Sequence, residues 1–226
     1  MRRIVSIQVG RPHKYEHDGA ADGKKRTWTT AFWKSPVAGS VRFGSLGAAG
    51  DEQADRENHG GLDKAVLAYS ADHYAYWRPH LNLPDMPHGG FGENLTIAGL
   101  DESGVCIGDR WQAGGVLFEV SQPRQPCWKM GRRWQIVDLP KQVIQNGKSG
   151  WYLRVLDEGE LAAGAEIELI ARPRPTWTIA RASRLLYHEN DNVAALEELT
   201  NVPELSRAWR EELLERIARA SGERQA

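Results

Sequence analysis

The sequence predicts a mainly β protein with some helices, a β-barrel or sandwich that is followed by a small three-helix unit. Short β-branched, aromatic or alternating runs fill the first three quarters of the chain. Glycine and proline are frequent there, but of the 23 Gly and 11 Pro only Gly222 and Pro203 follow Pro175. Apolar residues change to helical spacing from Ile179. We therefore expect a barrel domain at 1–172 and a three-helix extension at 176–226, because 226 residues allow one large domain with a small appendage.

The expected strands and helices follow from these patterns. Strands are expected at residues 3–9, 27–34, 65–69, 115–121, 151–156 and 165–170, where the residue types favour extended backbone. Helices are expected at 71–81 and 139–145. Asp138 is the expected N-cap of the second helix, with a proline in its first turn.

Three short helices are expected in the C-terminal extension. Asp191 and Asn201 are the expected N-caps, and Pro203 is expected at the start of the last helix. Such a unit could be a docking module for a partner or a lid over a site. It could equally be a cap that stabilises one flank of the barrel.

Composition and charge exclude several classes of protein. Lys+Arg 29 against Asp+Glu 30 gives a net charge of −1, so no general field attracts nucleic acid polymers. No run approaches the roughly 18 apolar residues of a membrane span, and the N-terminal MRRIVSIQVG is expected to form a strand and not a signal peptide. With two cysteines and no disulfide framework, the sequence predicts a cytoplasmic protein without a membrane partner.

The two cysteines differ in their surroundings. Cys106 lies between apolar residues before a turn, which is typical of a buried structural thiol. Cys127 follows an expected strand in a loop with two prolines, which end ladder pairing and make the loop rigid. Arg124 and Lys129 add positive charge, which favours the thiolate. Cys127 is thus a candidate nucleophile or soft-metal ligand.

Three further loops are candidate binding elements. Gly60 and Gly61 follow His59 and would let backbone N–H groups approach a phosphate or pterin, although a simple tight turn has the same pattern. Asn94 could offer its amide to a heterocycle or only satisfy loop backbone. The Lys34-Ser35 pair offers an ammonium and a hydroxyl, a modest anion site.

These loops, taken in order, resemble the MOSC domain family, and most closely its YiiM-like branch. The segments that carry the resemblance are FWKSPV at 32–37, GDEQAD at 50–55, HGGLDKAV at 59–66, FGENL at 91–95, GD at 108–109, SQPR at 121–124 and PC at 126–127. They cover most of residues 1–172, and the tail is similar to the three-helix extension of this branch. No P-loop, Gly-x-Ser-x-Gly or His-Glu-x-x-His motif competes with this assignment.

The resemblance implies a MOSC β-barrel, similar to the pyruvate-kinase-type barrel, that binds molybdenum cofactor. It implies that Cys127 is both the catalytic residue and the protein ligand of molybdenum, for which a thiolate is a suitable soft ligand. The cofactor-binding residues that it implies are Lys34, Ser35, His59, Gly60, Gly61, Asn94, Ser121 and Arg124.

The implied activity is reduction of N-hydroxylated compounds to amines, including N-hydroxylated purines such as 6-hydroxylaminopurine, which would detoxify mutagenic base analogues. Because the sequence has no recognisable flavin or haem motif, a separate electron-donor reductase, expected to be a flavoprotein, would supply electrons. Two alternatives stay open. Cys127 could carry a persulfide in a sulfur carrier or sulfurtransferase, or the chain could be a non-enzymatic module that binds the cofactor.

Overall fold

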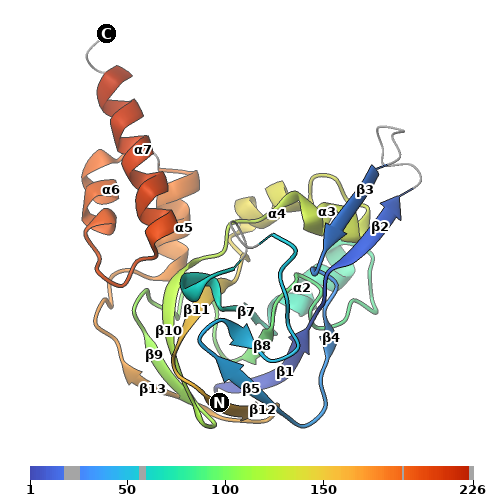
Figure 1. The fold of residues 1–226 in the computed structure, drawn as a ribbon. Helices are drawn as coiled ribbons and strands as arrows, with labels where there is room; N and C mark the ends of the chain where they lie inside the picture. The colour runs from blue at the N-terminus through green and yellow to red at the C-terminus, as the bar shows by residue number, and fades with distance from the viewer. Residues whose placement is uncertain (18–25, 56–59, 190, 224–226) are drawn as a thin grey trace.

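The computed structural model describes residues 1–17, 26–55, 60–189 and 191–223. These residues form a curved mixed sheet, a half-barrel, with helices at one end and a C-terminal group of helices at one flank (Figure 1). The mainly β class and the C-terminal helices agree with the sequence prediction. In the described part of the chain, no helix is long and apolar enough to cross a membrane.

The main sheet has eight strands. Their order is β13 (Ile167–Ala171), β9 (Arg110–Ala113), β10 (Val116–Pro123), β11 (Trp151–Asp157), β7 (Val66–Ser70), β8 (Leu95–Ala98), β1 (Arg3–Val9) and β4 (Ser35–Pro36). The β7–β8 pair is parallel and the other pairs are antiparallel. All residues of β7 are buried, which explains why this central strand is a continuous apolar run without alternation.

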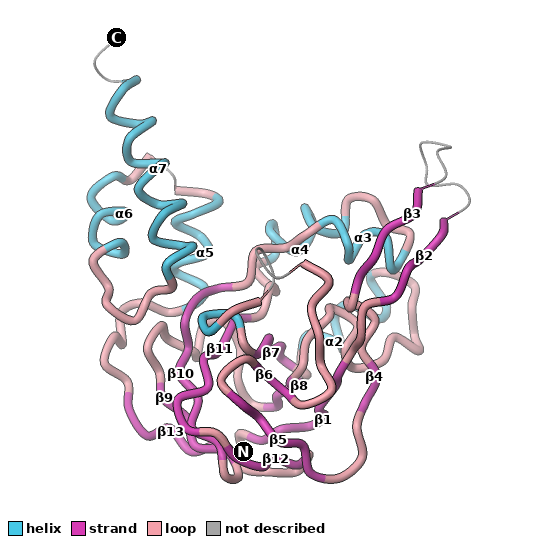
Figure 2. The backbone as a smooth tube through the Cα atoms, in the orientation of Figure 1, coloured by secondary structure: helices cyan, strands magenta, loops and turns pink. Residues whose placement is uncertain are grey.

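Two smaller sheets accompany the main sheet. One contains β12 (Gly159–Ala162), β5 (Ser40–Gly44) and β6 (Gly47–Ala48), and the other is the hairpin of β2 (His13–His17) and β3 (Arg26–Thr30). Figure 2 shows the loop between β6 and β7 passing between β10 and this hairpin. That loop therefore lies above one end of the sheet, where the pocket described below is found.

One predicted strand was too long. The strand expected at 27–34 ends at Thr30, and the chain pairs again only at Ser35. The Phe32 N–H donates to Thr30 Oγ1 at 3.0 Å, a local side-chain bond that replaces a ladder bond. The intervening residues leave the sheet, and several of them line the pocket.

The helices around the pocket include one that the sequence did not predict. α2 (His73–His80) and α4 (Leu139–Asn146) match their predictions, but α3 (Trp128–Trp134) begins directly after Cys127. Its short length and internal Gly131 gave no periodic signal. Asp138 stands at the N-cap of α4, where its carbonyl, and not its side chain, accepts from the Gln142 N–H.

The C-terminal helices are α5 (Ile179–Tyr187), α6 (Val193–Thr200) and α7 (Arg207–Glu223). Their existence was predicted, but their caps were not. Thr178 caps α5, Asn192 rather than Asp191 caps α6, and the Trp209 N–H donates to Ser206 Oγ at the start of α7. Asn201 instead ends α6, and Pro203 precedes α7 by a turn. These helices share one continuous apolar core with the barrel, to which Trp209 and Leu213 contribute.

Candidate functional site

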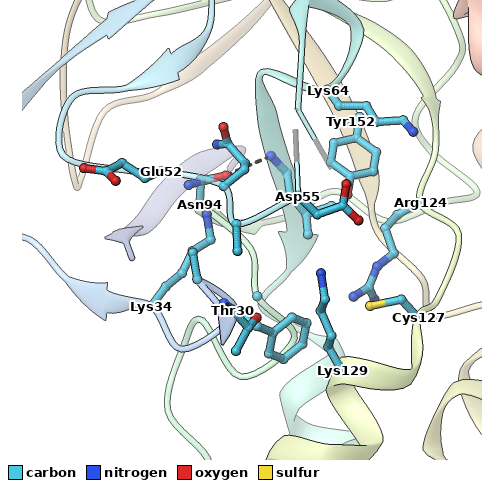
Figure 3. A pocket seen from close by; sticks show the side chains of 16 residues that line it. Thr30, Lys34, Glu52, Asp55, Lys64, Asn94, Arg124, Cys127, Lys129 and Tyr152 are labelled. Atoms are coloured by element: carbon cyan, nitrogen blue, oxygen red, sulfur yellow. Dashed lines mark hydrogen bonds between the residues drawn. The ribbon is translucent and has the colours of Figure 1, made fainter. Parts of the chain in front are cut away.

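A pocket opens between the end of β10, the start of α3, the β3–β4 segment and the β6–β7 loop. It holds about 590 Å³ of empty space, part of which is open solvent. Its lining residues are Thr30, Ala31, Phe32, Lys34, Glu52, Gln53, Ala54, Asp55, Lys64, Leu67, Gly92, Asn94, Arg124, Cys127, Lys129 and Tyr152. Segments that are far apart in the sequence thus converge on one cavity (Figure 3).

A β-bulge directs the cysteine loop into this cavity. Val120 pairs with Leu153 and Gln122 with Tyr152, so Ser121 is an extra residue in β10. Such a bulge bends the strand and changes the direction of the residues that follow. The loop after Pro123 is then held by the Arg124 N–H, which donates to the Gly150 carbonyl at 3.0 Å.

Arg124 and Cys127 lie together on one wall of the pocket. Figure 3 shows the Arg124 guanidinium beside the Cys127 sulfur. Arg124 is only 3% exposed, and its Nη2 donates to the Phe91 carbonyl at 3.1 Å. Its Nη1 is buried without a hydrogen-bond partner among the described residues. Since a buried charged donor without a partner is costly, this nitrogen marks the place of a ligand acceptor.

Lys129 adds a second cation to the same space. Its side chain rises from α3 toward the pocket (Figure 3), and the residue is 8% exposed. Within the described ranges it has no ion-pair or hydrogen-bond partner. Its Nζ is not among the fully buried unpaired atoms, so the ammonium faces the open space of the pocket, where its charge favours an anionic ligand.

Lys34 lines the pocket but is already neutralised. Its Nζ contacts both carboxylate oxygens of Asp51, at 2.7 and 2.6 Å, and the two side chains are 9% and 2% exposed. Burial lowers the pKa of Lys34, and the adjacent Asp51 carboxylate opposes that shift. The ammonium predicted as a free anion ligand therefore acts first as half of a buried ion pair that fixes the β6–β7 loop.

Two other predicted residues hold the walls of the pocket through backbone bonds. Asn94 Oδ1 accepts from the Leu67 N–H at 3.1 Å, and its Nδ2 donates to the Gln8 carbonyl at 3.2 Å. Ser121 Oγ lies 2.6 Å from the Asp63 carbonyl and is fully buried outside the lining. The structure thus places Asn94 in the pocket with its amide already bonded, and Ser121 behind it.

The remaining predicted residues lie further out. Ser35 is exposed on β4 and does not line the pocket. Gly60 and Gly61 lead into the 3₁₀ turn η1 (Leu62–Lys64), where Gly61 has φ 89, a left-handed conformation that favours glycine. Neither glycine lines the pocket, but Lys64 at the end of this turn does. His59 lies outside the described residues.

Sequence reasoning did not assign Lys129, Asp55, Lys64 or Tyr152 to the binding site. Tyr152 comes to the cavity through its pairing with Gln122 across β10 and β11, a long-range register that local pattern does not reveal. Lys129 did have a signal, since it lies two residues after Cys127.

Tyr152 is expected to make the protein less stable at alkaline pH. Burial raises its pKa from 10.0 to about 12, although Arg124 opposes the shift. Between these values the folded phenol keeps its proton while the unfolded one loses it, so the contribution of Tyr152 to stability is constant below pH 10.0 and falls as pH rises. The loss amounts to about 2–3 kcal/mol. The free energy of unfolding, measured in urea across this pH range, should fall less steeply with pH in Tyr152→Phe than in the wild type. Equal slopes in the two proteins would contradict the raised pKa of Tyr152.

Asp63 connects the pocket loop to the C-terminal helices. Its carboxylate accepts from Arg154 Nε at 2.7 Å and from the Arg207 N–H, at the start of α7, at 2.9 Å. Arg154 also donates to the Glu204 carbonyl at 2.7 Å. Burial acts to raise the pKa of Asp63, but these two donors outweigh it and hold the pKa below 3.8.

We expect Asp63→Ala to lower the free energy of unfolding at neutral pH by about 1–2 kcal/mol, because it removes the acceptor of Arg154 Nε and of the Arg207 N–H, while Arg154 Nη1 keeps its bonds to Glu119 and to the Glu204 carbonyl. A carboxyl with a lowered pKa contributes stability above its unfolded value of 3.8, and this contribution disappears as pH falls through the folded value. The difference between variant and wild type, measured by urea unfolding, should therefore shrink in acid. The control is Asp157→Ala, at an exposed position. If Asp63→Ala lost no more stability than this control, Asp63 would not connect the pocket loop to the C-terminal helices.

Comparison with known proteins identifies both parts of the chain. The MOSC domain family matches residues 55–168, and the family described as YiiM-like, 3-alpha helix domain matches residues 177–220. The YflK protein of Bacillus subtilis (strain 168) is 39% identical over 207 residues, which are 92% of this chain and 90% of that protein. Protein YiiM of Escherichia coli (strain K12) is 33% identical over 213 residues, 92% of this chain and 90% of YiiM.

A longer relative and two solved structures extend the comparison. A protein named reductase from Gibberella moniliformis is 36% identical over 205 residues, which cover 88% of this chain but 35% of that protein. The crystal structure of YiiM from Geobacillus stearothermophilus has a TM-score of 0.80 and 40% identity, and covers 96% of this chain and 100% of its own. The crystal structure of YiiM from Escherichia coli has a TM-score of 0.75 and 29% identity, and covers 98% of this chain and 94% of its own. The chain therefore belongs to the MOSC domain family and carries the YiiM-like 3-alpha helix domain at its C-terminal end.

Proposed function

We propose that the pocket binds molybdenum cofactor with Cys127 as the protein ligand of the metal, and that the protein reduces N-hydroxylated compounds to amines. The observation that carries the proposal is the wall where the Cys127 thiol, the unpaired Arg124 Nη1 and the unpartnered Lys129 ammonium meet, as described above. A soft thiolate suits molybdenum that a pterin dithiolene already holds. The buried Arg124 guanidinium and the Lys129 ammonium suit the phosphate of such a cofactor.

The residues present fit this group. Arg124 would donate from Nη1 to a phosphate oxygen, and Lys129 would neutralise negative charge beside the thiolate. Asn94 and the Lys34–Asp51 pair would keep the surrounding loops in place through the bonds described above. The bound cofactor would supply a two-electron redox centre, which is chemistry that no side chain of the pocket provides.

The proposed reaction is balanced by an external donor. The N–O bond of the N–OH group breaks, two electrons and two protons are taken up, and an amine and one water form. A separate flavin-containing reductase would supply the electrons. The pocket lining contains the ammonium groups of Lys34, Lys64 and Lys129. Lys34 is held by Asp51, so Lys64 and Lys129 are proposed to supply a proton to the departing oxygen.

Two of the comparisons support reductive chemistry. The MOSC family is generally associated with molybdenum cofactor, and one relative at 36% identity is named a reductase. The chain spans about a third of that longer relative. The donor is proposed to be a second protein because the sequence shown has no recognisable flavin or haem motif.

The test is a reductive titration. Protein purified from a host that makes the cofactor is reduced chemically and then mixed with 6-hydroxylaminopurine. We expect one adenine formed for each two electrons stored, and none in Cys127→Ser. A wild type that carries the cofactor and is reduced, but forms no adenine or other amine from N-hydroxylated compounds, would support a module that only binds the cofactor. Labile sulfur on Cys127 without molybdenum would instead support sulfur transfer.

A further inference from the structure

A second recess adjoins the first pocket at Cys127 and shares part of its lining. It holds about 730 Å³ of empty space up to its mouth. Its own lining residues are Gln122, Gln125, Pro126 and Trp128, and it shares Asp55, Lys64, Cys127 and Tyr152 with the first pocket. The two spaces therefore meet at the thiol.

Gln122 gives this recess a chemical preference. It is 1% exposed, and its Nε2 donates to the Pro123 carbonyl at 3.2 Å, which fixes the orientation of the amide. Its Oε1 is consequently the buried atom that has no donor among the described residues. A buried amide oxygen without a donor is unfavourable, and an N–H group from a ligand would satisfy it. The first pocket offers unpaired donors, whereas this recess offers an unpaired acceptor.

Trp128 gives the recess a flat apolar wall. It is 52% exposed although it directly follows Cys127. The ring of Trp28 lies edge-on to it with centroids 6.3 Å apart, and the Arg132 guanidinium lies 5.6 Å from the Trp128 ring and 5.1 Å from that of Trp28. These contacts hold the exposed indole in place before any ligand binds. A preordered aromatic face of this kind stacks well on planar conjugated molecules.

We infer that this recess is the substrate subsite, in which Gln122 Oε1 accepts an N–H of the substrate and Trp128 stacks on its plane. The two residues would thus select planar conjugated N-hydroxylated compounds that carry an N–H donor over aliphatic ones or those without a donor. This inference rests on the proposed function and assigns the specificity of the same site.

Ligand binding tests the assignment without turnover. The probes are adenine and 9-methyl-6-dimethylaminopurine, a planar analogue with no N–H donor, measured by titration calorimetry on protein from the cofactor-making host. Gln122→Leu should weaken adenine binding about tenfold, the effect of losing one hydrogen bond at a buried acceptor, and leave the methylated probe unchanged. Trp128→Ala should weaken both probes, while Trp128→Phe retains most of the binding.

Gln8→Leu is the matched control, because Gln8 is also buried with an unpaired Oε1 but does not line the recess. It should bind both probes as the wild type does. Equal adenine affinity in Gln122→Leu and wild type, equal losses for both probes, or no adenine binding to the wild type would overturn the inference. Binding requires no electrons, so the two hypotheses can fail separately. If the wild type reduces N-hydroxylated compounds but Gln122→Leu binds adenine as tightly as the wild type, only the subsite is refuted. If Gln122→Leu weakens adenine binding and leaves the methylated probe unchanged, but the protein contains no molybdenum, only the proposed function is refuted.

Discussion

Arg124→Met is expected to weaken molybdenum cofactor binding by roughly 10- to 150-fold, the effect of losing one charge-assisted hydrogen bond worth about 1.5–3 kcal/mol. Methionine keeps much of the length and apolar surface of the side chain, but it removes the buried Nη1 that has no protein partner. Cofactor retained through gel filtration, measured as molybdenum and pterin per chain, should fall accordingly.

The matched control is Arg133→Met. Arg133 donates to the carbonyls of Gly89 at 2.5 Å and Phe32 at 3.2 Å, so it supports the same loops as Arg124, but it does not line the pocket. The variant is expected to lose stability while it retains cofactor in its folded fraction. If both variants lost cofactor equally, Arg124 would be a support for the loop and not a ligand.

Glu93→Ala is expected to be the most destabilising single change near the site. Glu93 is fully buried, and its carboxylate accepts from the N–H groups of Gly89 (2.7 Å) and Phe91 (3.1 Å) and from the hydroxyls of Tyr74 (2.5 Å) and Thr96 (3.0 Å). Alanine would leave these donors unpaired in an apolar interior, which costs about 3–5 kcal/mol in total. The melting temperature should fall by about 10 °C.

The damage should extend to the pocket. Phe91 is the residue whose carbonyl orients Arg124, so the folded fraction of Glu93→Ala should also bind cofactor less tightly. The control is Glu160→Ala, since Glu160 is exposed and its carboxylate bonds only Ser40 Oγ among the described contacts. That variant should change stability by no more than about 0.5 kcal/mol. A Glu93→Ala protein as stable as this control would show that the 88–94 loop does not depend on the carboxylate.

Sequence reasoning was most successful where chemistry is local. The strand at 3–9 was found from its alternating apolar residues, and the helix at 139–145 from Asp138 and the proline that follows it. The three C-terminal helices were found from helical apolar spacing and from the loss of glycine and proline. Arg124 and Cys127 share one short loop, so their association required only that the loop be rigid. The family resemblance supplied the ligand and activity that are proposed for them.

Long-range pairing decided what sequence reasoning did not find. The Lys34 ammonium was expected to meet a ligand, but Asp51, 17 residues away, occupies it. Ser35 follows Lys34 in sequence, yet it lies on the exposed edge strand β4 and outside the pocket lining. Tyr152 and Gln122 meet through a bulged register whose position depends on the whole sheet. These features depend on tertiary packing, about which local propensity carries no information.

Molybdenum per chain, measured by elemental analysis after expression in a host that makes the cofactor, tests the central claim most directly. The comparison is between wild type, Cys127→Ser and Cys106→Ser. Cys106 is buried, and its Sγ lies 3.6 Å from the Pro175 carbonyl, a contact that a serine hydroxyl can keep. We predict molybdenum in the wild type and in Cys106→Ser, and its loss in Cys127→Ser. Equal molybdenum in all three proteins, or none in the wild type despite abundant cofactor, would contradict the role of Cys127 as the metal ligand.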